Sequence, residues 1–318
     1  MNIDLGGAAG PDGWPRPGCR CASCARLRTA GIGHEPARIL IDGVPPAEHA
    51  HQEVPGGFDV RPSPGRRVLV ARGPGARPEA VAGVVYDAVL LDLVGCPDHL
   101  GLLRRTGAVG AATEVLNVYA DHRVPSPAEL ERRLGFWLPP RRGPHRTLLL
   151  GGARSGKSAE AELRLMGDPD VTYVATGPAR GDDPEWNARV DAHRRRRPHW
   201  WATAETTELA RELTSGAGAG SGALLVDGIG TWLTAAMDEA GAWEDPARVE
   251  PRLDELIAAW RSTAARVVAV TDEVGLSLVP TTPAGRAFRD VLGHLNQRLA
   301  AESEEAALVI AGRVTELS

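Results

Sequence analysis

The stretch RTLLLGGARSGKSAEAELRLM, residues 146–166, decides the fold of much of this chain. Its apolar run TLLL is followed by GGARSGKS, which matches the pattern G-x-x-x-x-G-K-[ST], and then by a helix-forming segment. Glycines let the backbone bend so that successive N–H groups face phosphate oxygens, and the following helix adds its positive end. The stretch therefore predicts a strand, a phosphate-binding loop (P-loop) and a helix.

The residue types within this loop predict nucleotide chemistry. Lys157 is the only lysine of the chain, and its compact charge suits β and γ phosphates better than a planar arginine. Ser158 is the expected ligand of Mg²⁺. The alternative is a chance match in a glycine-rich chain, against which the preceding strand and following helix argue. The predicted nucleotide-binding residues of the loop are Gly151, Gly152, Ala153, Arg154, Ser155, Gly156, Lys157 and Ser158.

Apolar runs recur through the second half of the chain with helical stretches between them. The expected strands are residues 146–152, 170–176, 222–228, 265–271 and 306–312, and helices are expected within 246–265 and 284–305. Such strands, apolar on both faces, indicate a parallel sheet covered by helices on both sides. The predicted class is an α/β P-loop NTPase with a mostly parallel, RecA-like sheet. The segment GAGAGSG, 216–222, is expected to be a flexible loop.

A carboxylate ends one of these strands, in LLVDG, residues 224–228. Asp227 is placed as in a Walker B element, where it binds Mg²⁺ directly or through water. An Asp at a strand end also serves as a turn or helix cap. Combined with the phosphate-binding loop, the metal role is favoured.

The first half is expected to form a separate, smaller α/β domain. Its predicted strands and helices lie at 37–43, 66–73, 86–95, 99–108 and 126–138, the last with Ser126 as N-cap and Pro127 at the first helical position. The segment 138–146 carries Pro, Gly and charge without periodicity and is predicted to be a linker. The expected domains are residues 1–145 and 146–318.

Composition limits the function. The 318 residues carry a net charge of −5, which argues against a general nucleic-acid-binding protein. No apolar run is long enough to span a membrane, and the N-terminus does not read as a signal peptide, so a cytoplasmic protein is expected. Four arginines, Arg194 to Arg197, nevertheless follow His193 directly. By itself this run fits a nucleic-acid patch, a solvated helix end or an active site.

The order of six sequence blocks indicates the role of this arginine run. After GGARSGKS come YVATG (173–177), RVDAHRRRRPHWWATAE (189–205), LLVDGIGTWLT (224–234), VTDEVGLSLVP (270–280) and GHLNQRLA (293–300). Over residues 146–318 this order resembles the bifunctional adenosylcobinamide kinase / adenosylcobinamide-phosphate guanylyltransferases of cobalamin biosynthesis. The resemblance implies phosphorylation of adenosylcobinamide with ATP or GTP. It then implies transfer of GMP from GTP to adenosylcobinamide phosphate, in a protein that forms a homo-oligomer.

The resemblance also implies a guanylylated histidine in an H-x-x-x-R-P block, here His193, Arg197 and Pro198. A neutral imidazole is a fair nucleophile toward phosphorus, and adjacent guanidinium groups stabilise the charge that develops. The expected catalytic residues are therefore His193, Lys157 and Asp227. Expected at the nucleotide are also Ala175, Thr176, Gly177, Arg194, Arg195, Arg196, Arg197 and Glu205.

Further positions follow from the resemblance with less force. A general base or magnesium partner is expected among residues 271–273, and 296–298 are either substrate contacts or an ordinary helix surface. The family's Asp-Cys-Leu-Thr-x-Trp block matches at Asp227 and Trp232, but not at residues 228–230. Two other functions stay open: a P-loop kinase of another small alcohol without guanylyl transfer, and a nucleotide-binding scaffold.

The first half carries CRCASC, residues 19–24. This segment resembles the start of metallo-β-lactamase-fold phosphodiesterases, and the resemblance implies a structural zinc on three cysteines and a late histidine. The implied zinc ligands are Cys19, Cys21, Cys24 and His122, with Cys96 and His99 as weaker candidates. The alternative is three free thiols.

The catalytic element of that fold, H-x-H-x-D-H, is incomplete in this chain. His49 and His51 are present, but residues 52–54 are Gln, Glu and Val. The first half is therefore expected to be a truncated, noncatalytic metallo-β-lactamase-like domain.

Overall fold

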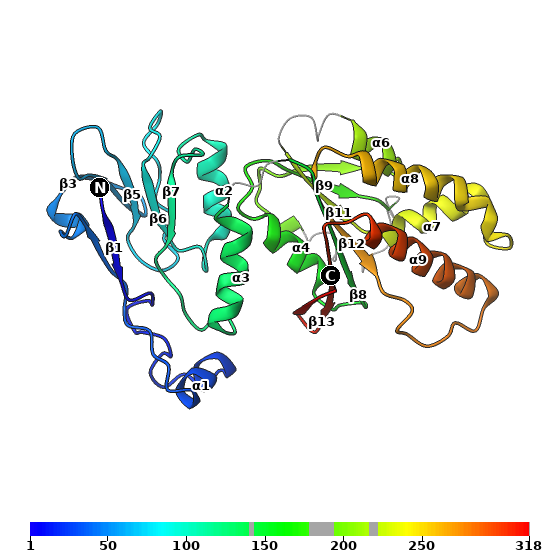
Figure 1. The fold of residues 1–318 in the computed structure, drawn as a ribbon, viewed down its shortest axis with the longest axis horizontal. Coiled ribbons are helices and arrows are strands. Elements are labelled where there is room, and N and C mark those ends of the chain that lie inside the picture. Colours follow the sequence, from blue (N-terminus) through cyan, green and yellow to red (C-terminus); the bar gives the residue numbers. More distant parts are fainter. Residues whose placement is uncertain (140–142, 178–193, 216–221, 318) are drawn as a thin grey trace. The chain divides into compact units, whose positions relative to one another are not determined.

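The computed structural model describes residues 1–139, 143–177, 194–215 and 222–317 (Figure 1). The chain divides into two compact units. Unit 1 comprises Met1–Pro140 and Met166–Pro169, and unit 2 comprises Arg141–Leu165 and Asp170–Ser318.

Unit 2 is built on a seven-stranded sheet in the order β10-β9-β11-β12-β8-β13-β14. All neighbouring pairs are parallel except β13–β14, which is an antiparallel hairpin. The strands are β8 (His145–Gly151), β9 (Val171–Ala175), β10 (Ala202–Glu205), β11 (Ala223–Asp227), β12 (Arg266–Asp272), β13 (Glu305–Ile310) and β14 (Arg313–Glu316). The parallel sheet predicted from the apolar runs is confirmed.

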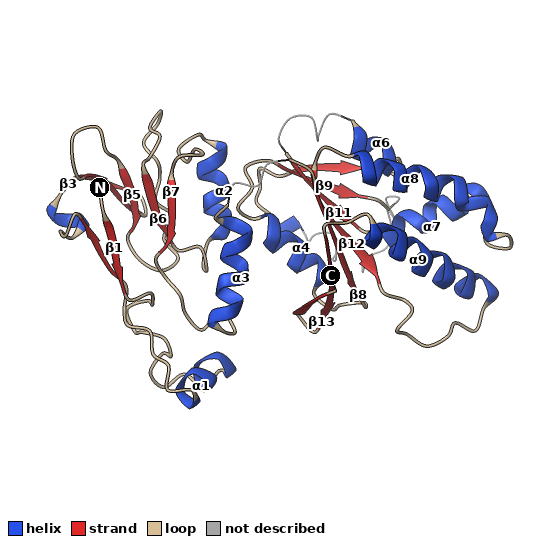
Figure 2. Cartoon of the chain, viewed as in Figure 1, coloured by secondary structure: helices blue, strands red, loops and turns tan. Residues whose placement is uncertain are grey.

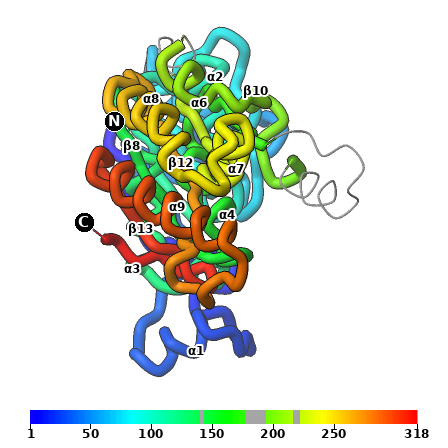
Figure 3. Tube along the Cα trace, turned by 90° about the vertical axis from the view of Figure 1, so that its right-hand side faces the viewer, coloured from blue at the N-terminus to red at the C-terminus, as the bar shows by residue number. Residues whose placement is uncertain are grey.

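Helices of unit 2 cover both faces of this sheet. They are α4 (Lys157–Leu165), α6 (Leu209–Thr214), α7 (Ile229–Ala240), the 3-10 turn η2 (Pro246–Val249), α8 (Glu250–Ser262) and α9 (Pro283–Ala301). In Figures 1 and 3, α7, α8 and α9 lie together on one face, and Figure 1 shows α4 on the other. Alternate strand residues point into the core beneath α7 to α9. Buried there are Leu148, Leu224, Trp232, Trp260 and Leu292.

The five predicted strands of this half all form, and two further strands do not follow from the apolar pattern. β10 has the sequence ATAE and is mostly exposed because it lies at the sheet edge. β14 closes the other edge and is also largely exposed. An edge strand needs no second apolar face, so neither segment shows the buried-strand pattern. Residues 216–221 of the predicted glycine-rich loop lie outside the described residues.

Unit 1 contains a five-stranded mixed sheet, β3-β4-β5-β6-β7, and a separate antiparallel pair, β1–β2. Within the larger sheet, β3–β4 and β4–β5 are antiparallel, whereas β5–β6 and β6–β7 are parallel. The strands are β1 (Ile3–Gly6), β2 (Arg38–Ile41), β3 (Ala50–Val54), β4 (Gly57–Arg61), β5 (Val68–Ala71), β6 (Ala88–Leu91) and β7 (Glu114–Asn117).

Within the described residues of unit 1, three helices and one 3-10 turn accompany these strands (Figure 2). They are α1 (Ala22–Thr29), η1 (Pro46–Glu48), α2 (Pro97–Arg105) and α3 (Pro127–Trp137). The predicted cap of α3 is confirmed, since the Ser126 hydroxyl accepts a hydrogen bond from the Glu129 amide at 3.2 Å and Pro127 opens the helix. The hairpin β3–β4 was not predicted, because AHQEV in β3 is polar and mostly exposed.

Two further expectations concern the boundary and the membrane. The predicted linker 138–146 overlaps the first residues of β8, and residues 140–142 lie outside the described part. Among the helices that the structure describes, none is both long enough and apolar enough to cross a membrane.

Candidate active site

The predicted P-loop of unit 2 connects β8 to α4, and two of its glycines are required by the local backbone geometry. A side chain at Gly151 would place its Cβ 2.6 Å from the carbonyl oxygen of Val309, so only glycine fits. Gly156 has φ +99°, a region that glycine adopts at little cost. The Ser155 carbonyl accepts from the Gly312 amide at 2.7 Å, which ties the loop to the turn after β13. The Ser155 hydroxyl is buried and has no hydrogen-bond partner within the described residues.

Lys157 begins α4 and turns back over the loop. Its ammonium nitrogen Nζ lies 3.1 Å from the Gly152 carbonyl oxygen and 2.8 Å from Asp272 Oδ1. Asp272 ends β12, the strand paired with β8, so the parallel register brings Asp272 beside Gly151. The only lysine of the chain is thus held at the mouth of the loop by a carboxylate of the neighbouring strand.

Asp227 ends β11 and faces the start of α4. Its Oδ1 lies 3.4 Å from the Ser158 hydroxyl, and its Oδ2 accepts a hydrogen bond from the Tyr173 hydroxyl at 3.0 Å. Tyr173 lies on β9, which pairs with β11. The two residues predicted to hold Mg²⁺, Ser158 and Asp227, are therefore brought together by strands and a helix far apart in sequence.

The arginine run approaches the same carboxyl end of the sheet. The Arg196 guanidinium makes two hydrogen bonds, of 2.8 and 3.1 Å, to the carboxylate of Glu162 on α4. The Arg197 guanidinium lies over the Tyr173 ring, 3.6 Å from its centroid. Arg194 lies 3.7 Å from Glu205 at the end of β10, and both side chains are more than half exposed. Two members of the run are thus held close to the Asp227 carboxylate.

The charged groups at this point shift one another's pKa values. Burial, together with the Asp227 carboxylate, raises the pKa of the Tyr173 hydroxyl, so this hydroxyl remains a hydrogen-bond donor to Asp227. Burial lowers the pKa of Arg197, whereas the hydrogen bond to Glu162 raises that of Arg196. The arrangement gathers donors for phosphate oxygens beside a hydroxyl and a carboxylate that suit a hard cation.

Other predicted nucleotide residues have different surroundings. His193 lies outside the described residues. The Thr176 hydroxyl is buried and donates to the Gly228 carbonyl oxygen at 2.6 Å, so it joins β9 to β11. Ala175 ends β9, in register with Glu205, and Gly177 follows it by two residues. Arg154 has φ +57° in the P-loop, and Arg195 is exposed.

Residues 296–298, the candidate substrate contacts, lie on α9. Asn296 is buried, accepting from the Thr271 hydroxyl at 2.7 Å and donating to the Asp272 carbonyl oxygen at 3.1 Å. It therefore fixes the end of β12. Arg298 pairs with Asp254 at 2.6 Å on an exposed helix face, and Gln297 is exposed. Asn296 thus has a structural role at the end of β12, Gln297 and Arg298 lie on the helix surface, and a substrate contact of these residues stays a prediction.

The replaced Walker B positions have a local explanation at Gly230. A Cβ there would lie 3.0 Å from Asp272 Oδ2 and 3.6 Å from Leu292. The glycine therefore leaves room for the carboxylate that holds Lys157.

Two side chains received no role from the sequence. Tyr173 lies inside the quoted block YVATG, and Glu162 lies in a segment expected only to be helical. Their positions depend on strand pairing and on the orientation of α4, which periodicity does not give. The only sign of a role for Glu162 is its position on α4, where the neighbouring side chains are buried.

Unit 1 contains a separate group of metal-ligand side chains. The thiol sulfurs of Cys19, Cys21 and Cys24 lie within 4.8 Å of one another, the only such group of three in the described chain. Cys21 Sγ accepts from the Cys24 amide at 3.5 Å, and this bond lowers the pKa of Cys21. Burial raises the pKa of Cys24 to about 11. His122 is not part of the group, although Val124, two residues on, belongs to the same buried apolar cluster as Cys24.

The weaker zinc candidates and the histidine pair of unit 1 lie elsewhere. Cys96 Sγ donates to the Gly75 carbonyl oxygen at 3.4 Å, and His99 Nε2 lies 3.0 Å from that of Pro78. His49 Nε2 and His51 Nδ1 each contact a backbone carbonyl oxygen, at 2.8 and 2.9 Å. Within the part of the chain that the structure describes, none of these four residues belongs to the cysteine group.

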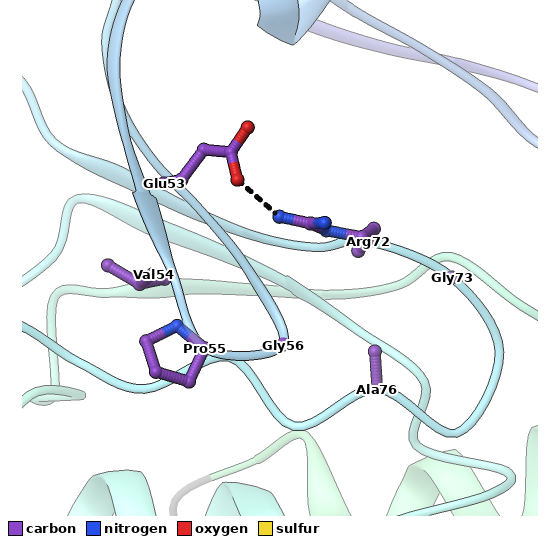
Figure 4. A pocket seen from close by; sticks show the side chains of 7 residues that line it. All are labelled: Glu53, Val54, Pro55, Gly56, Arg72, Gly73 and Ala76. Carbon is purple, nitrogen blue, oxygen red and sulfur yellow. Dashed lines mark hydrogen bonds and ion pairs between the residues drawn. The ribbon is translucent and has the colours of Figure 1, made fainter.

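An open hollow of about 650 Å³ lies at the β3–β4 turn of unit 1 (Figure 4). Across it the Arg72 guanidinium contacts the Glu53 carboxylate at 2.9 Å. Its lining residues are Glu53, Val54, Pro55, Gly56, Arg72, Gly73 and Ala76. The two charged groups pair with each other, and we assign no ligand or reaction to this hollow.

Comparison with known proteins identifies the family of unit 2. The model of the family described as cobinamide kinase / cobinamide phosphate guanyltransferase matches residues 147–317. The bifunctional adenosylcobalamin biosynthesis protein CobU of Salmonella typhimurium is 40% identical over 174 residues, which is 52% of this chain and 95% of that protein.

Two further relatives agree. CobU of Escherichia coli is 36% identical over 174 residues, with the same coverage of both chains. The bifunctional adenosylcobalamin biosynthesis protein CobP of Pseudomonas aeruginosa is 38% identical over 170 residues, 52% of this chain and 94% of that protein. The chain therefore belongs to the cobinamide kinase / cobinamide phosphate guanyltransferase family.

Proposed function

We propose that unit 2 phosphorylates the hydroxyl of adenosylcobinamide with ATP or GTP and then transfers GMP from GTP to the resulting phosphate. The family assignment supports both reactions. The observation that carries the residue roles is the convergence of Lys157, Asp272, Ser158 and Asp227 at the P-loop, with Arg197 next to Asp227 through Tyr173.

In the kinase step, the loop amides and Lys157 hold the β and γ phosphates. The substrate hydroxyl oxygen attacks the γ-phosphorus, the bond to the β-phosphate oxygen breaks, and the nucleoside diphosphate leaves. Asp272, placed 2.8 Å from Lys157, is the candidate base that takes the hydroxyl proton. Lys157 changes partner from Asp272 to the phosphates when nucleotide binds.

Mg²⁺ fits the oxygen donors at the end of β11. A serine hydroxyl and a carboxylate oxygen 3.4 Å apart match the hard ligands that Mg²⁺ prefers. Ser158 and Asp227 would hold the ion, directly or through water. Once bound, it would neutralise charge on the phosphate oxygens.

In the guanylyl step, an imidazole nitrogen of His193 attacks the α-phosphorus of GTP and pyrophosphate leaves. The phosphate oxygen of adenosylcobinamide phosphate then attacks the same phosphorus, which frees His193 and gives adenosylcobinamide-GDP. Arginines 194–197 supply charge for the equatorial oxygens and the departing pyrophosphate. Arg197, pre-oriented on an aromatic ring, is the best placed of these among the described residues.

Incubation with GTP labelled at the α-phosphate tests this assignment. The wild-type protein should acquire acid-labile, alkali-stable label, and adenosylcobinamide phosphate should discharge it. His193→Ala should remove the label. His199→Ala, at an exposed histidine in the same segment, is the matched control and should retain it. Label that survives in His193→Ala would mean that another residue is the nucleophile.

The same experiment separates the remaining functions. A kinase of another alcohol would phosphorylate its substrate without acquiring label. A nucleotide-binding scaffold would show no dependence on the corrinoid substrate in either assay.

For unit 1 we infer a noncatalytic domain stabilised by zinc. Three cysteine sulfurs within 4.8 Å support a thiolate-rich site, which suits tetrahedral zinc. His122 is the proposed fourth ligand, because its segment continues into Val124, which belongs to the same buried apolar cluster as Cys24. The likeness of CRCASC to metallo-β-lactamase-fold phosphodiesterases supports a truncated domain of that type, and the engaged His49 and His51 support the loss of hydrolytic activity.

A further inference from the structure

Tyr173 lies between two groups that the proposed reactions use separately. Its hydroxyl donates to Asp227 Oδ2 at 3.0 Å, while the face of its ring carries the Arg197 guanidinium at 3.6 Å from the centroid. Only 8% of the residue is exposed. One side chain of β9 thus contacts both the proposed metal carboxylate and an arginine of the guanylyl block.

The hydroxyl restricts the orientation of the Asp227 carboxylate. A carboxylate at the end of a strand can rotate about its Cβ–Cγ bond, which exchanges its two oxygens. Because Oδ2 accepts the hydrogen bond from Tyr173, Oδ1 is left facing the Ser158 hydroxyl. That is the orientation in which a serine and an aspartate can share one cation.

The ring restricts Arg197 in a different way. A guanidinium plane that lies on an aromatic face is held by cation–π attraction and by contact area, without using its N–H donors on the ring. Its sequence neighbour Arg196 is fixed independently on α4 by Glu162, which is 3% exposed. Both contacts hold the arginine segment against the carboxyl end of the sheet.

We propose that Tyr173 is a positioning residue for both half-reactions: its hydroxyl orients Asp227 toward the metal, and its ring orients Arg197 toward the nucleotide phosphates. This inference rests on the proposed function for its kinetic readouts. It assigns separate tasks to two parts of one side chain, so two substitutions separate them.

Tyr173→Phe removes the hydroxyl and keeps the ring. We expect the Mg²⁺ concentration needed for half-maximal activity to rise about tenfold in both reactions, the order expected when one charge-assisted hydrogen bond is lost. Saturating Mg²⁺ should restore both rates to within about twofold. Calorimetric binding of ATP should weaken with Mg²⁺ present and stay unchanged with EDTA.

Tyr173→Leu removes the ring as well. We expect self-guanylylation to stay at least about tenfold low even at saturating Mg²⁺, because Arg197 has lost its platform. At saturating Mg²⁺, combining Tyr173→Leu with Arg197→Gln should slow guanylylation no further than Arg197→Gln alone, since the ring and the guanidinium act through one contact. Tyr86→Phe, at a buried tyrosine of unit 1, is the matched control and should change none of these quantities.

The outcomes distinguish this inference from the proposed function. If Tyr173→Phe leaves the Mg²⁺ dependence of ATP binding unchanged, the hydroxyl does not orient the metal carboxylate. If the Tyr173→Leu and Arg197→Gln effects simply add, the ring does not position Arg197. Should the wild-type protein lack both corrinoid activities, the proposed function fails, while the calorimetric comparison still decides the role of the hydroxyl. If Tyr173→Leu does not fold, Tyr173→Met supplies the ring-free variant for the same comparison.

Discussion

The ammonium of Lys157 and the carboxylate of Asp272 lie 2.8 Å apart, although 115 positions separate them in the chain. The Lys157 side chain is 13% exposed, whereas that of Asp272 is 46% exposed. A half-exposed carboxylate forms a weak ion pair that phosphate can displace. The pair is therefore suited to hold the lysine until nucleotide arrives and then to leave the carboxylate available for the acceptor hydroxyl.

Lys157→Ala should abolish both the kinase activity and the guanylylation if, as we propose, both reactions hold their triphosphate in the same loop. Rates measured with ATP and with α-labelled GTP check this. Guanylylation retained in this variant would mean that the two reactions use separate nucleotide sites.

Asp272→Asn should separate binding from chemistry. Removing a negative charge near the phosphates should tighten Mg²⁺-free ATP binding about two- to fivefold, while loss of the base should lower kcat of the kinase about 100-fold or more. Calorimetry and steady-state kinetics measure the two effects. An unchanged kcat would restrict Asp272 to holding Lys157.

Gly230→Ala should weaken the Lys157–Asp272 pair by displacing the carboxylate. The new Cβ would lie 3.0 Å from Asp272 Oδ2, so the side chain must shift. We expect ATP binding without Mg²⁺ and kcat of the kinase to change in the same directions as in Asp272→Asn, but by less, in the same assays. Gly293→Ala on α9 is the control, since its Cβ would meet nothing within 4 Å and should leave kcat unchanged. Equal effects of the two variants would contradict this prediction.

The full chain should bind one zinc ion at the cysteine group of unit 1. Serine at Cys19, Cys21 or Cys24 should abolish binding, while Cys96→Ser should not, because Cys96 lies outside the group. Zinc uptake should release protons, because the thiols must become thiolates to bind the ion, and Cys24, of which burial raises the pKa to about 11, must be one source. Metal analysis with pH-stat titration measures both, and His122→Ala tests the fourth ligand. A metal content well below one zinc per chain would remove the assignment.

Glu305 should stabilise unit 2 in a pH-dependent way. It contacts Arg164, which is 1% exposed, and His145 at 3.5 Å. Although burial raises its pKa, the hydrogen bond from His145 and the charge of Arg164 lower it to about 2, from the ordinary 4.5. The carboxylate therefore contributes stability above about pH 4.5, and that contribution disappears as the pH falls through about 2.

Glu305→Gln should lower the free energy of unfolding by about 2 kcal/mol at pH 7, with the difference from wild type shrinking below pH 4.5. Urea unfolding at pH 7 and pH 3 checks this. Glu302→Gln, at a partly exposed partner of the exposed Arg261, should cause no measurable change. A difference that persists undiminished at pH 3 would show that packing, rather than charge, is responsible.

The order of elements in unit 2 was predictable because each buried strand is apolar on both faces and is separated from the next by a segment with helical or loop-forming residues. Residues 146–152, for example, correspond closely to β8, His145–Gly151. Edge strands such as β10 escaped prediction because their exposed faces show no apolar run. In unit 1 the polar strand β3 escaped for the same reason.

The sequence by itself determined the glycine-rich loop between β8 and α4, the parallel sheet that supports it and the family to which the chain belongs, because these depend on local patterns and on the order of motifs. Only the tertiary structure decided which side chains meet. Strand register placed Asp272 against Lys157 and Tyr173 against Asp227, and the orientation of α4 brought Glu162 to Arg196. These contacts join residues tens of positions apart. Local sequence patterns do not show such contacts, because they exist only once the strands have paired and the helices have packed on the sheet.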